Sequence, residues 1–154
     1  MFSVVLGLLN VESWLDKGGL LLFDAAGGSA EATVSFDALM AQLYPQVTSS
    51  TLPPDHPIYT ASFDGVEAAE HRIDGVTYRS SAEERRLPAT KLPRLRGFTI
   101  DGRLVAIESP QDLSAALVGY GTGGITGYTP RSAVELMRNI LHFAATRPKP
   151  AVKK

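Results

Sequence analysis

The chain contains no cysteine. This absence excludes disulfide bonds, thiolate metal ligands and a cysteine nucleophile, and it leaves the redox compartment open. The sequence also has no excess of charge, because 15 basic and 16 acidic residues give a formal net charge of −1. Such a balance provides no bulk electrostatic attraction to nucleic acid or to anionic lipid. We therefore expect neither of them as a partner.

No hydrophobic run is long enough to span a bilayer. The N-terminal stretch MFSVVLGLLNVESW holds an apolar run of roughly ten residues, whereas a transmembrane helix needs about 20. It has no basic residue before it and no small-residue cleavage site after it, so it lacks the features of a signal peptide. We expect no direct membrane insertion of this chain, and the sequence leaves its compartment undetermined.

Length and composition fit one domain. The 154 residues are 44% hydrophobic and 20% charged, which is an ordinary globular balance. We predict a single α/β domain over residues 1–146, with a charged hairpin and loop excursion from the core at residues 64–94 and a flexible Pro/Lys-rich tail at residues 147–154. Because the chain begins with a helix that leads into a buried strand, it also fits the later part of a longer polypeptide.

The stretch GGLLLFDAAGG, residues 18–28, holds the strongest strand signal. Residues 20–23 are apolar without alternation and are bounded by glycines, which predicts a central strand covered on both faces in a mainly parallel sheet. Helical spacing predicts a helix before it that ends at Gly18 and a second helix after it over residues 36–43, with Ser35 as N-cap and Pro45 just beyond its end.

The second half of the chain predicts an edge strand, two hairpins and a final helix. Residues 58–63 are expected to form the short edge strand. Two Asp-Gly pairs, at residues 74–75 and 101–102, predict tight hairpin turns. Thr129 and Pro130 predict the N-cap and first residue of the final helix. Its predicted core-facing stripe consists of Val134, Met137, Ile140, Leu141 and Ala144.

Four separated segments carry a family resemblance: GGLLLFDAAGG, LPPDHPIY, RLVAIESPQDL and YTPRSAVELMRNILHFA. In this order they resemble a bacterial family known as domain of unknown function 4159, which is similar in turn to class I glutamine amidotransferase-like and trehalose-utilisation-like folds. The resemblance covers residues 12–145 and implies a flavodoxin-like, mainly parallel sheet flanked by helices, with an antiparallel hairpin at one edge. The family's first strand and helix have no evident counterpart in this chain. No activity is established for the family.

Asp24 is the first candidate for a pocket residue. Ligands of open α/β sheets gather outside the carboxyl ends of the parallel strands, and Asp24 stands at that end of the apolar run. Gly27 and Gly28 follow directly and would let a ligand approach the backbone. In the alternative interpretation, Asp24 caps its own loop by accepting hydrogen bonds from the amides of residues 26–29. The sequence leaves both interpretations open.

Four further residues complete the candidate pocket. Asp55 and His56 lie in a loop stiffened by prolines. The histidine can serve there as a base or a ligand. A structural role is favoured, because the side chains of sequence neighbours rarely point at the same atom. Ser109 and Asp112 follow a predicted strand and share the carboxyl edge if that strand is parallel to the first. The favoured alternative makes Ser109 the N-cap of a short helix that begins at Pro110.

Other motifs are weaker. GYGTGG, residues 119–124, matches G-x-G-x-x-G but lacks a strand before it and a helix directly after it, so we interpret it as a mobile loop. His71, with Glu70 and Asp74, surrounds a predicted turn and has no further ligand residues nearby. His142 is expected at the surface of the last helix. We therefore predict no metal and no cofactor.

Two functional hypotheses follow. The glutamine hydrolysis that the fold resemblance suggests needs a thiolate on a sharp turn, so the absence of cysteine and of a G-x-S-x-G motif excludes that mechanism. We favour a non-catalytic module that binds a small molecule, a protein or a second copy through the loops of Asp24, Asp55, His56 and Asp112. The alternative is a hydrolase in which Asp24 and His56 converge to activate water.

Overall fold

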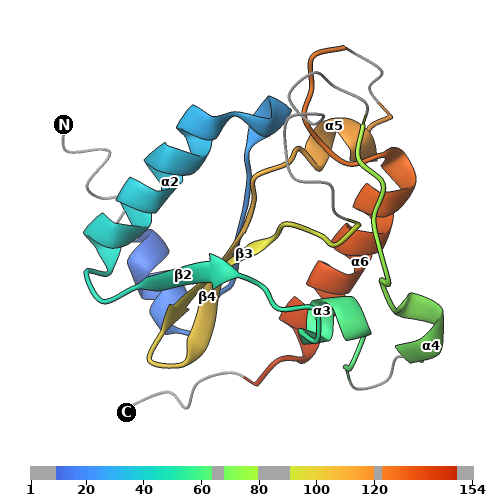
Figure 1. The fold of residues 1–154 in the computed structure, drawn as a ribbon. Coiled ribbons are helices and arrows are strands. Elements are labelled where there is room, and N and C mark those ends of the chain that lie inside the picture. The colour runs from blue at the N-terminus through green and yellow to red at the C-terminus, as the bar shows by residue number, and fades with distance from the viewer. Residues whose placement is uncertain (1–9, 64–67, 80–90, 120–122, 149–154) are drawn as a thin grey trace.

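The computed structural model describes residues 10–63, 68–79, 91–119 and 123–148. In Figure 1, helices lie on either side of a small sheet, with α2 and α6 as the two long ones. Residues 10–16 are helical and precede the first strand. The elements that follow are β1 Leu21–Asp24, η1 Ala26–Gly28, α2 Ala30–Leu43, β2 Thr48–Thr51, α3 Pro57–Thr60, α4 Ala68–His71, β3 Arg96–Ile100, β4 Arg103–Ser109, α5 Ser114–Leu117 and α6 Pro130–Thr146.

The sheet is mixed, and β1 lies at its edge. The strand order is β1-β4-β3-β2. β1 pairs in parallel with β4, whereas the β4–β3 and β3–β2 pairs are antiparallel. For the described residues, the predictions of a mainly parallel sheet and of a central first strand are therefore wrong. The apolar run indicated that both faces of the strand are covered, but cover on the faces does not require a partner at both edges.

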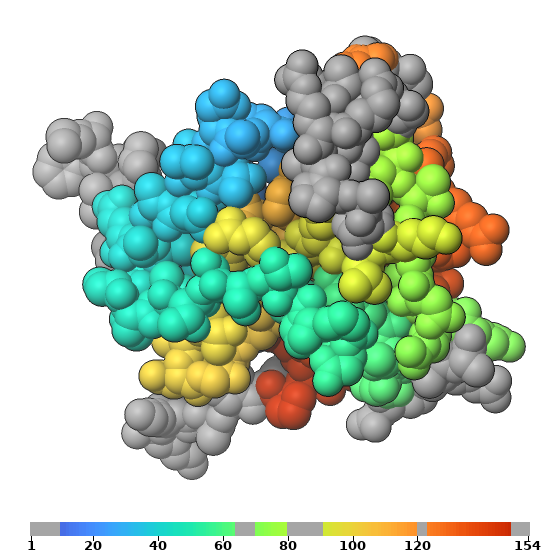
Figure 2. All heavy atoms as spheres, in the orientation of Figure 1, coloured from blue at the N-terminus to red at the C-terminus, as the bar shows by residue number. Residues whose placement is uncertain are grey.

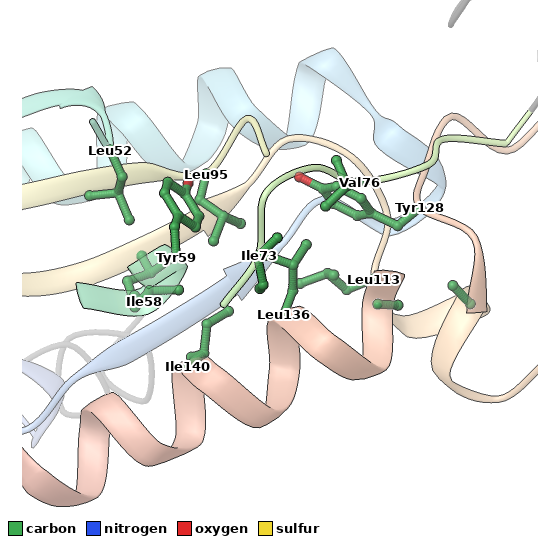
Figure 3. Close-up of a cluster of buried hydrophobic side chains, with 13 residues drawn as sticks. Leu52, Ile58, Tyr59, Ile73, Val76, Leu95, Leu113, Tyr128, Leu136 and Ile140 are labelled. Atoms are coloured by element: carbon green, nitrogen blue, oxygen red, sulfur yellow. The ribbon is translucent and has the colours of Figure 1, made fainter. Parts of the chain in front are cut away.

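Two hydrophobic clusters cover the two faces of the sheet. Side chains alternate along a strand, and accordingly Leu20 and Leu22 contact one cluster while Leu21 and Phe23 contact the other. The first cluster lies against α6, where Leu136 and Ile140 approach Leu113 and Ile73 (Figure 3). The second lies against α2.

The aromatic ring of Phe36 fixes α2 on the second face. It stacks on Phe23 of β1 with ring centroids 4.2 Å apart, and it meets Phe98 of β3 edge-on at 5.1 Å. The N-cap of α2 is Ser29, whose hydroxyl accepts a hydrogen bond from the amide of Ala32 at 3.2 Å. The helix therefore starts earlier than the predicted N-cap, Ser35, and it ends just before Pro45 as predicted.

The second edge of the sheet is β2, not residues 58–63. All four residues of Thr48–Thr51 are exposed, and the segment that includes β2 crosses the visible face of Figure 2. Because this strand is polar throughout, it shows neither alternation nor an apolar run, so the sequence pattern did not reveal it. Residues 58–60 instead belong to α3, which His56 caps and in which Pro57 takes the first position.

The two Asp-Gly pairs have different outcomes. Asp101 and Gly102 form the predicted tight turn, because Ile100 pairs with Arg103 and both turn residues have positive φ, at 49° and 76°. These signs are typical of a type I′ hairpin. The hairpin predicted at residues 74–75 is wrong.

The residues around positions 74–75 pair with distant segments instead of with each other. The amide of Ile73 donates to the carbonyl of Tyr59 at 2.8 Å, and that of Val76 donates to the carbonyl of Lys91 at 2.6 Å. Tertiary partners therefore override the local turn signal. Residues 64–67 and 80–90 of the predicted excursion lie outside the described residues, as do residues 120–122 of GYGTGG.

The start of α6 is predicted correctly, but its core face is not. Thr129 and Pro130 begin the helix, and Ile140 is buried as expected. Val134 and Leu141, however, are 53% and 61% exposed. The face turned to the core instead presents Ser132, Ala133, Leu136, Asn139 and Ile140.

The C-terminal end of α6 is joined to the beginning of the sheet. The guanidinium of Arg147, the first residue of the predicted tail, donates to the carbonyls of Gly18 and Gly19 at 2.6 Å and to that of Leu104 at 2.5 Å. The division into one domain and a tail stays a prediction. Within the described part of the chain, no helix is both long enough and apolar enough to cross a membrane.

Candidate functional site

Asp24 ends β1, and its carboxylate binds the start of α5. Oδ1 accepts a hydrogen bond from the amide of Leu113 at 2.9 Å, and Oδ2 accepts one from the amide of Ser114 at 2.9 Å and another from the Ser114 hydroxyl. Asp24 is therefore a cap, as one interpretation held, but the amides that it binds are not those of residues 26–29. It caps a helix that lies far away in the sequence.

Asp112 makes the converse contact. Its Oδ2 accepts from the amide of Gly27 at 2.6 Å, and its Oδ1 accepts from the amide of Ala115 at 2.7 Å. The side chain is almost fully buried, with the residue 3% exposed. The loop after β1 is thus held by an aspartate from the loop after β4, and the start of α5 is held by an aspartate from β1. We call Asp24 and Asp112 the crossed aspartates.

The two glycines after Asp24 have different roles. Gly28 has a φ of 75°, and a side chain there would collide with the backbone oxygen of Thr126. Gly28 therefore permits two loops to pack closely, which leaves no room for a ligand at that position. Gly27 has a φ of 70° but faces open space. Its carbonyl accepts from the amide of Thr126 at 3.1 Å, so its backbone is engaged as well.

Ser109 shares the carboxyl edge with Asp24 but is not an N-cap. The two residues are direct partners in the parallel β1–β4 pair, as the sequence hypothesis required. The Ser109 hydroxyl is buried and donates to the carbonyl of Gln111 at 2.6 Å. Because α5 begins only at Ser114, the N-cap interpretation of Ser109 is wrong. Its side chain instead shapes the turn that leads to Asp112.

His56 lies apart from the crossed aspartates. The ring centroid of His56 is 5.3 Å from that of Phe143. Phe143 lies one helical turn before Arg147, and the side chain of Arg147 binds the backbone near the start of β1 and of β4. The crossed aspartates lie at the other end of those strands. Figure 1 likewise shows α3 and α5 at opposite ends of α6. The structure therefore brings Asp24, Ser109 and Asp112 together but not His56 or its exposed neighbour Asp55.

The imidazole of His56 serves as the cap of α3. Its Nδ1 accepts a hydrogen bond from the amide of Ile58 at 3.2 Å. Burial lowers the pKa of His56, and the charge of Asp55 opposes this effect. Both the burial and the accepted hydrogen bond favour the neutral ring.

We expect His56 to make stability fall below pH 6.5. Folding lowers its pKa, so its contribution is present above the pKa of about 6.5 in the unfolded chain and is lost as the pH falls through the folded value. Urea unfolding between pH 7.5 and 5 measures this, alongside NMR titration of the ring. His56→Asn keeps an acceptor at the cap and removes the titration, so it should flatten the profile. A measured pKa at or above 6.5 would contradict the argument.

Sequence reasoning missed a charged cluster on the α2 face. Arg96 donates to Glu108 at 2.5 Å, to Asp37 at 2.9 Å and to the Ser49 hydroxyl at 3.0 Å. Glu108 is fully buried, and this burial raises its pKa. The cluster joins α2 to β2, β3 and β4. Four charged and polar residues in separate segments gave no sequence signal, because only the strand register places Arg96 opposite Glu108.

A polar cleft of about 620 Å³ was also missed. It lies where the helical residues 10–16, the end of α2 and the β3–β4 turn meet, and Glu12, Asp16, Asp101 and Arg103 line it. Tyr44 also lines it, and its hydroxyl donates to Asp16 at 3.0 Å. Burial raises the pKa of Tyr44. Nowhere in the described residues do three or more His, Asp or Glu side chains gather in a way that could hold a metal.

The fold and the site define an α/β domain with a mixed sheet whose aspartates at the carboxyl edge are bound to backbone amides. The chain matches the family model described as a domain of unknown function, DUF4159, over residues 7–145, and it belongs to this family. The family resemblance is thereby confirmed. No curated protein and no solved structure matches the chain, so the similarity to glutamine amidotransferase-like folds stays a prediction.

Proposed function

We propose that this domain is a non-catalytic protein-binding module and that the open edge of β1 is its binding surface. By the open edge we mean the side of β1 that faces away from β4. The observation that carries the proposal is the position of β1, an apolar strand that ends the described sheet instead of standing at its centre.

The backbone of β1 can accept a further strand at this edge. The amide of Ala25 donates to the carbonyl of Ser109 at 3.0 Å, towards β4. In a strand with parallel pairing, the residues that bond to one neighbour alternate with those that face the other side. The N–H and C=O groups of Leu22 therefore face the open edge.

Apart from the short length of β1, which is four residues, the described residues 20–23 hold no lysine, proline or bulge that would keep an exposed strand from pairing. Proteins protect sheet edges with lysine, proline, bulges or an overlying loop. Residues 20–23 are three leucines and a phenylalanine, and all four are only half-buried. A half-buried apolar edge of this kind is typical of a surface that binds another chain by strand addition.

The hydrogen bonds that the crossed aspartates accept support a non-catalytic role. Both oxygens of each crossed aspartate accept hydrogen bonds from backbone amides. A carboxylate used in this way could act as a base only by releasing the loop that it holds. The water-activating pair of the hydrolase hypothesis also needs His56, which packs against Phe143 instead. No described contact favours that second function.

Amide hydrogen exchange followed by NMR tests the proposal. At a concentration where light scattering gives the monomer mass, we expect Leu22 to exchange roughly 100-fold faster than Phe23, whose amide faces β4. Binding of a partner should abolish this difference. Equal and strong protection of both amides in the monomer would mean that the chain itself covers the edge, and the proposal would then be wrong.

A further inference from the structure

We infer that a cleft at the start of β1 binds a small aromatic carboxylate. The cleft has a volume of about 320 Å³. It is lined by Trp14, Lys17, residues 18–20, Ala144 and Arg147, and we call it the Trp14 cleft. This inference goes beyond the proposed function, because it concerns a small molecule and does not need a partner at the open edge of β1.

Three elements surround the Trp14 cleft, and one side chain holds two of them together. The helical residues 10–16 provide Trp14, the approach to β1 provides residues 18–20, and the end of α6 provides Ala144. The guanidinium of Arg147, just after α6, donates to two backbone carbonyls of that approach, both at 2.6 Å. These walls are therefore fixed relative to each other. A volume of about 320 Å³ is at the lower end of the range for small-molecule sites.

The apolar part of the Trp14 cleft suits an aromatic ring. Besides Leu20 and Ala144, it contains the indole of Trp14, which lies against the backbone of Gly19. A Cβ added to Gly19 would collide with three adjacent atoms of the fused rings at once, and such an approach is possible only over the face of the indole. The glycine therefore covers one face of the ring. Trp14 is nevertheless 49% exposed, so indole surface is left on which a ligand ring can stack.

The ionisable side chains that line the Trp14 cleft are both cationic, and no described acidic residue lines it. Lys17 is exposed and Arg147 is half-buried. Within the described residues, neither of them is within ion-pair distance of a carboxylate. Asp16, the sequence neighbour of Lys17, lines the separate polar cleft, where it accepts a hydrogen bond from the Tyr44 hydroxyl. The charge of the Trp14 cleft therefore favours an anionic ligand.

The surroundings of Arg147 favour an anion with a single charge. Burial lowers the pKa of Arg147, and the positive charge of Arg103 lowers it further. A negative charge in the cleft would oppose both effects. The guanidinium already donates to the carbonyls of Gly18, Gly19 and Leu104, and the partial negative charge of these oxygens disfavours a doubly charged head group. A carboxylate meets both conditions, and the apolar wall accommodates the ring that carries it.

Fluorescence titration of the full chain tests the inference, because Trp14 is the only tryptophan in the sequence and lines the cleft. We expect phenylacetate to change the Trp14 emission saturably. Phenylacetamide has the same shape without the charge, and acetate has the charge without the ring. Each of these two should bind at least about tenfold more weakly, because it lacks either the ionic or the aromatic interaction. Phenylacetate should also shift the NMR amide resonances of Gly18 and Gly19.

Lys17→Gln tests the ionic contact. It should weaken the binding of phenylacetate about two- to fivefold, the effect typical of one exposed ion pair, and leave the affinity for phenylacetamide unchanged. Because Lys17 is exposed, this change should leave the fold intact. Lys91→Gln is the matched control, since it removes the same charge from an exposed lysine that does not line the cleft. It should leave the affinity for phenylacetate unchanged.

Three outcomes would overturn the inference. Phenylacetate that gives no saturable change in emission and no shift at Gly18 or Gly19 does not bind in the cleft. Equal affinities for phenylacetate and phenylacetamide would show that the cleft does not recognise the charge. Equal effects of Lys17→Gln and Lys91→Gln would show only a general attraction of anions to the chain. None of these outcomes bears on the proposed function, since the exchange rate of the Leu22 amide is measured without a ligand.

Discussion

Replacing Gly28 with alanine is expected to lower the free energy of unfolding by roughly 2–4 kcal/mol, the sum of backbone strain and a forced shift of a packed loop. Gly28 has a φ of 75°, and an added Cβ would collide with the backbone oxygen of Thr126. A backbone atom cannot rotate away as the end of a side chain can, so the loop itself must move. Urea unfolding followed by circular dichroism measures the loss.

Gly27→Ala is the matched control for this prediction. Gly27 has nearly the same backbone conformation, with a φ of 70°, but a Cβ there would meet no atom within 4 Å. Only the strain of positive φ remains, which is about 1 kcal/mol. If the free energy of unfolding fell equally in the two variants, the contact with Thr126 would add no cost, and glycine would be required at position 28 only for its positive φ.

Removing the carboxylate of Asp112 is expected to cost roughly 3 kcal/mol. Asp112→Ala removes an acceptor that is almost fully buried, and the amides of the exposed Gly27 and the half-buried Ala115 lose their bonds to it. A hydrogen bond to a charged group is worth about 1.5–3 kcal/mol, and solvent access to the two amides places each loss near the lower end. Asp24→Ala should cost less, roughly 1–2 kcal/mol, because Asp24 is only half-buried and Ser114 is exposed, so water can replace more of the lost bonding. Equilibrium unfolding of both variants measures the two losses.

The double variant tests whether the crossed aspartates act together. Each of them holds the start of α5, and Asp112 also holds the loop after β1. The first substitution should therefore already loosen the start of α5, so that the second substitution has less ordered structure left to disrupt. We expect the combined loss to be smaller than the sum of the single losses by about 0.5–3 kcal/mol, as found for residues that share partners. Strictly additive losses would show that the two loops respond independently.

Part of the fold was predictable from local sequence. The tight turn at Asp101 and Gly102 and the start of α6 at Pro130 occur where the pattern placed them, and the strand predicted at residues 20–23 occurs one residue later, at 21–24. Each of these depends on the conformational preferences of a few adjacent residues. The polar strand β2 was not predictable, because its residues adopt an extended conformation only through pairing with β3.

The orientation of α6 shows where a periodic pattern becomes ambiguous. Apolar residues occupy two adjacent faces of the helix, and the helical period permits either of them to contact the core. Asn139 helps to decide between the faces, because its amide reaches the carbonyls of Ile58 and His71 only when its own face points inward. A buried asparagine that binds two distant carbonyls has no signature in the sequence around it.

The sequence by itself determined the family, the apolar strand and the position of Asp24 at the carboxyl end of that strand. Only the tertiary structure decided that β1 ends the described sheet and that Asp24 binds Leu113 and Ser114, 89 and 90 residues further along the chain. The physical reason is that a carboxylate binds whichever free amides face it. The amide of Gly27, close to Asp24 in sequence, donates to Asp112 instead. The parallel pairing of β1 with β4 is the cause, because it brings the loops that follow the two strands side by side.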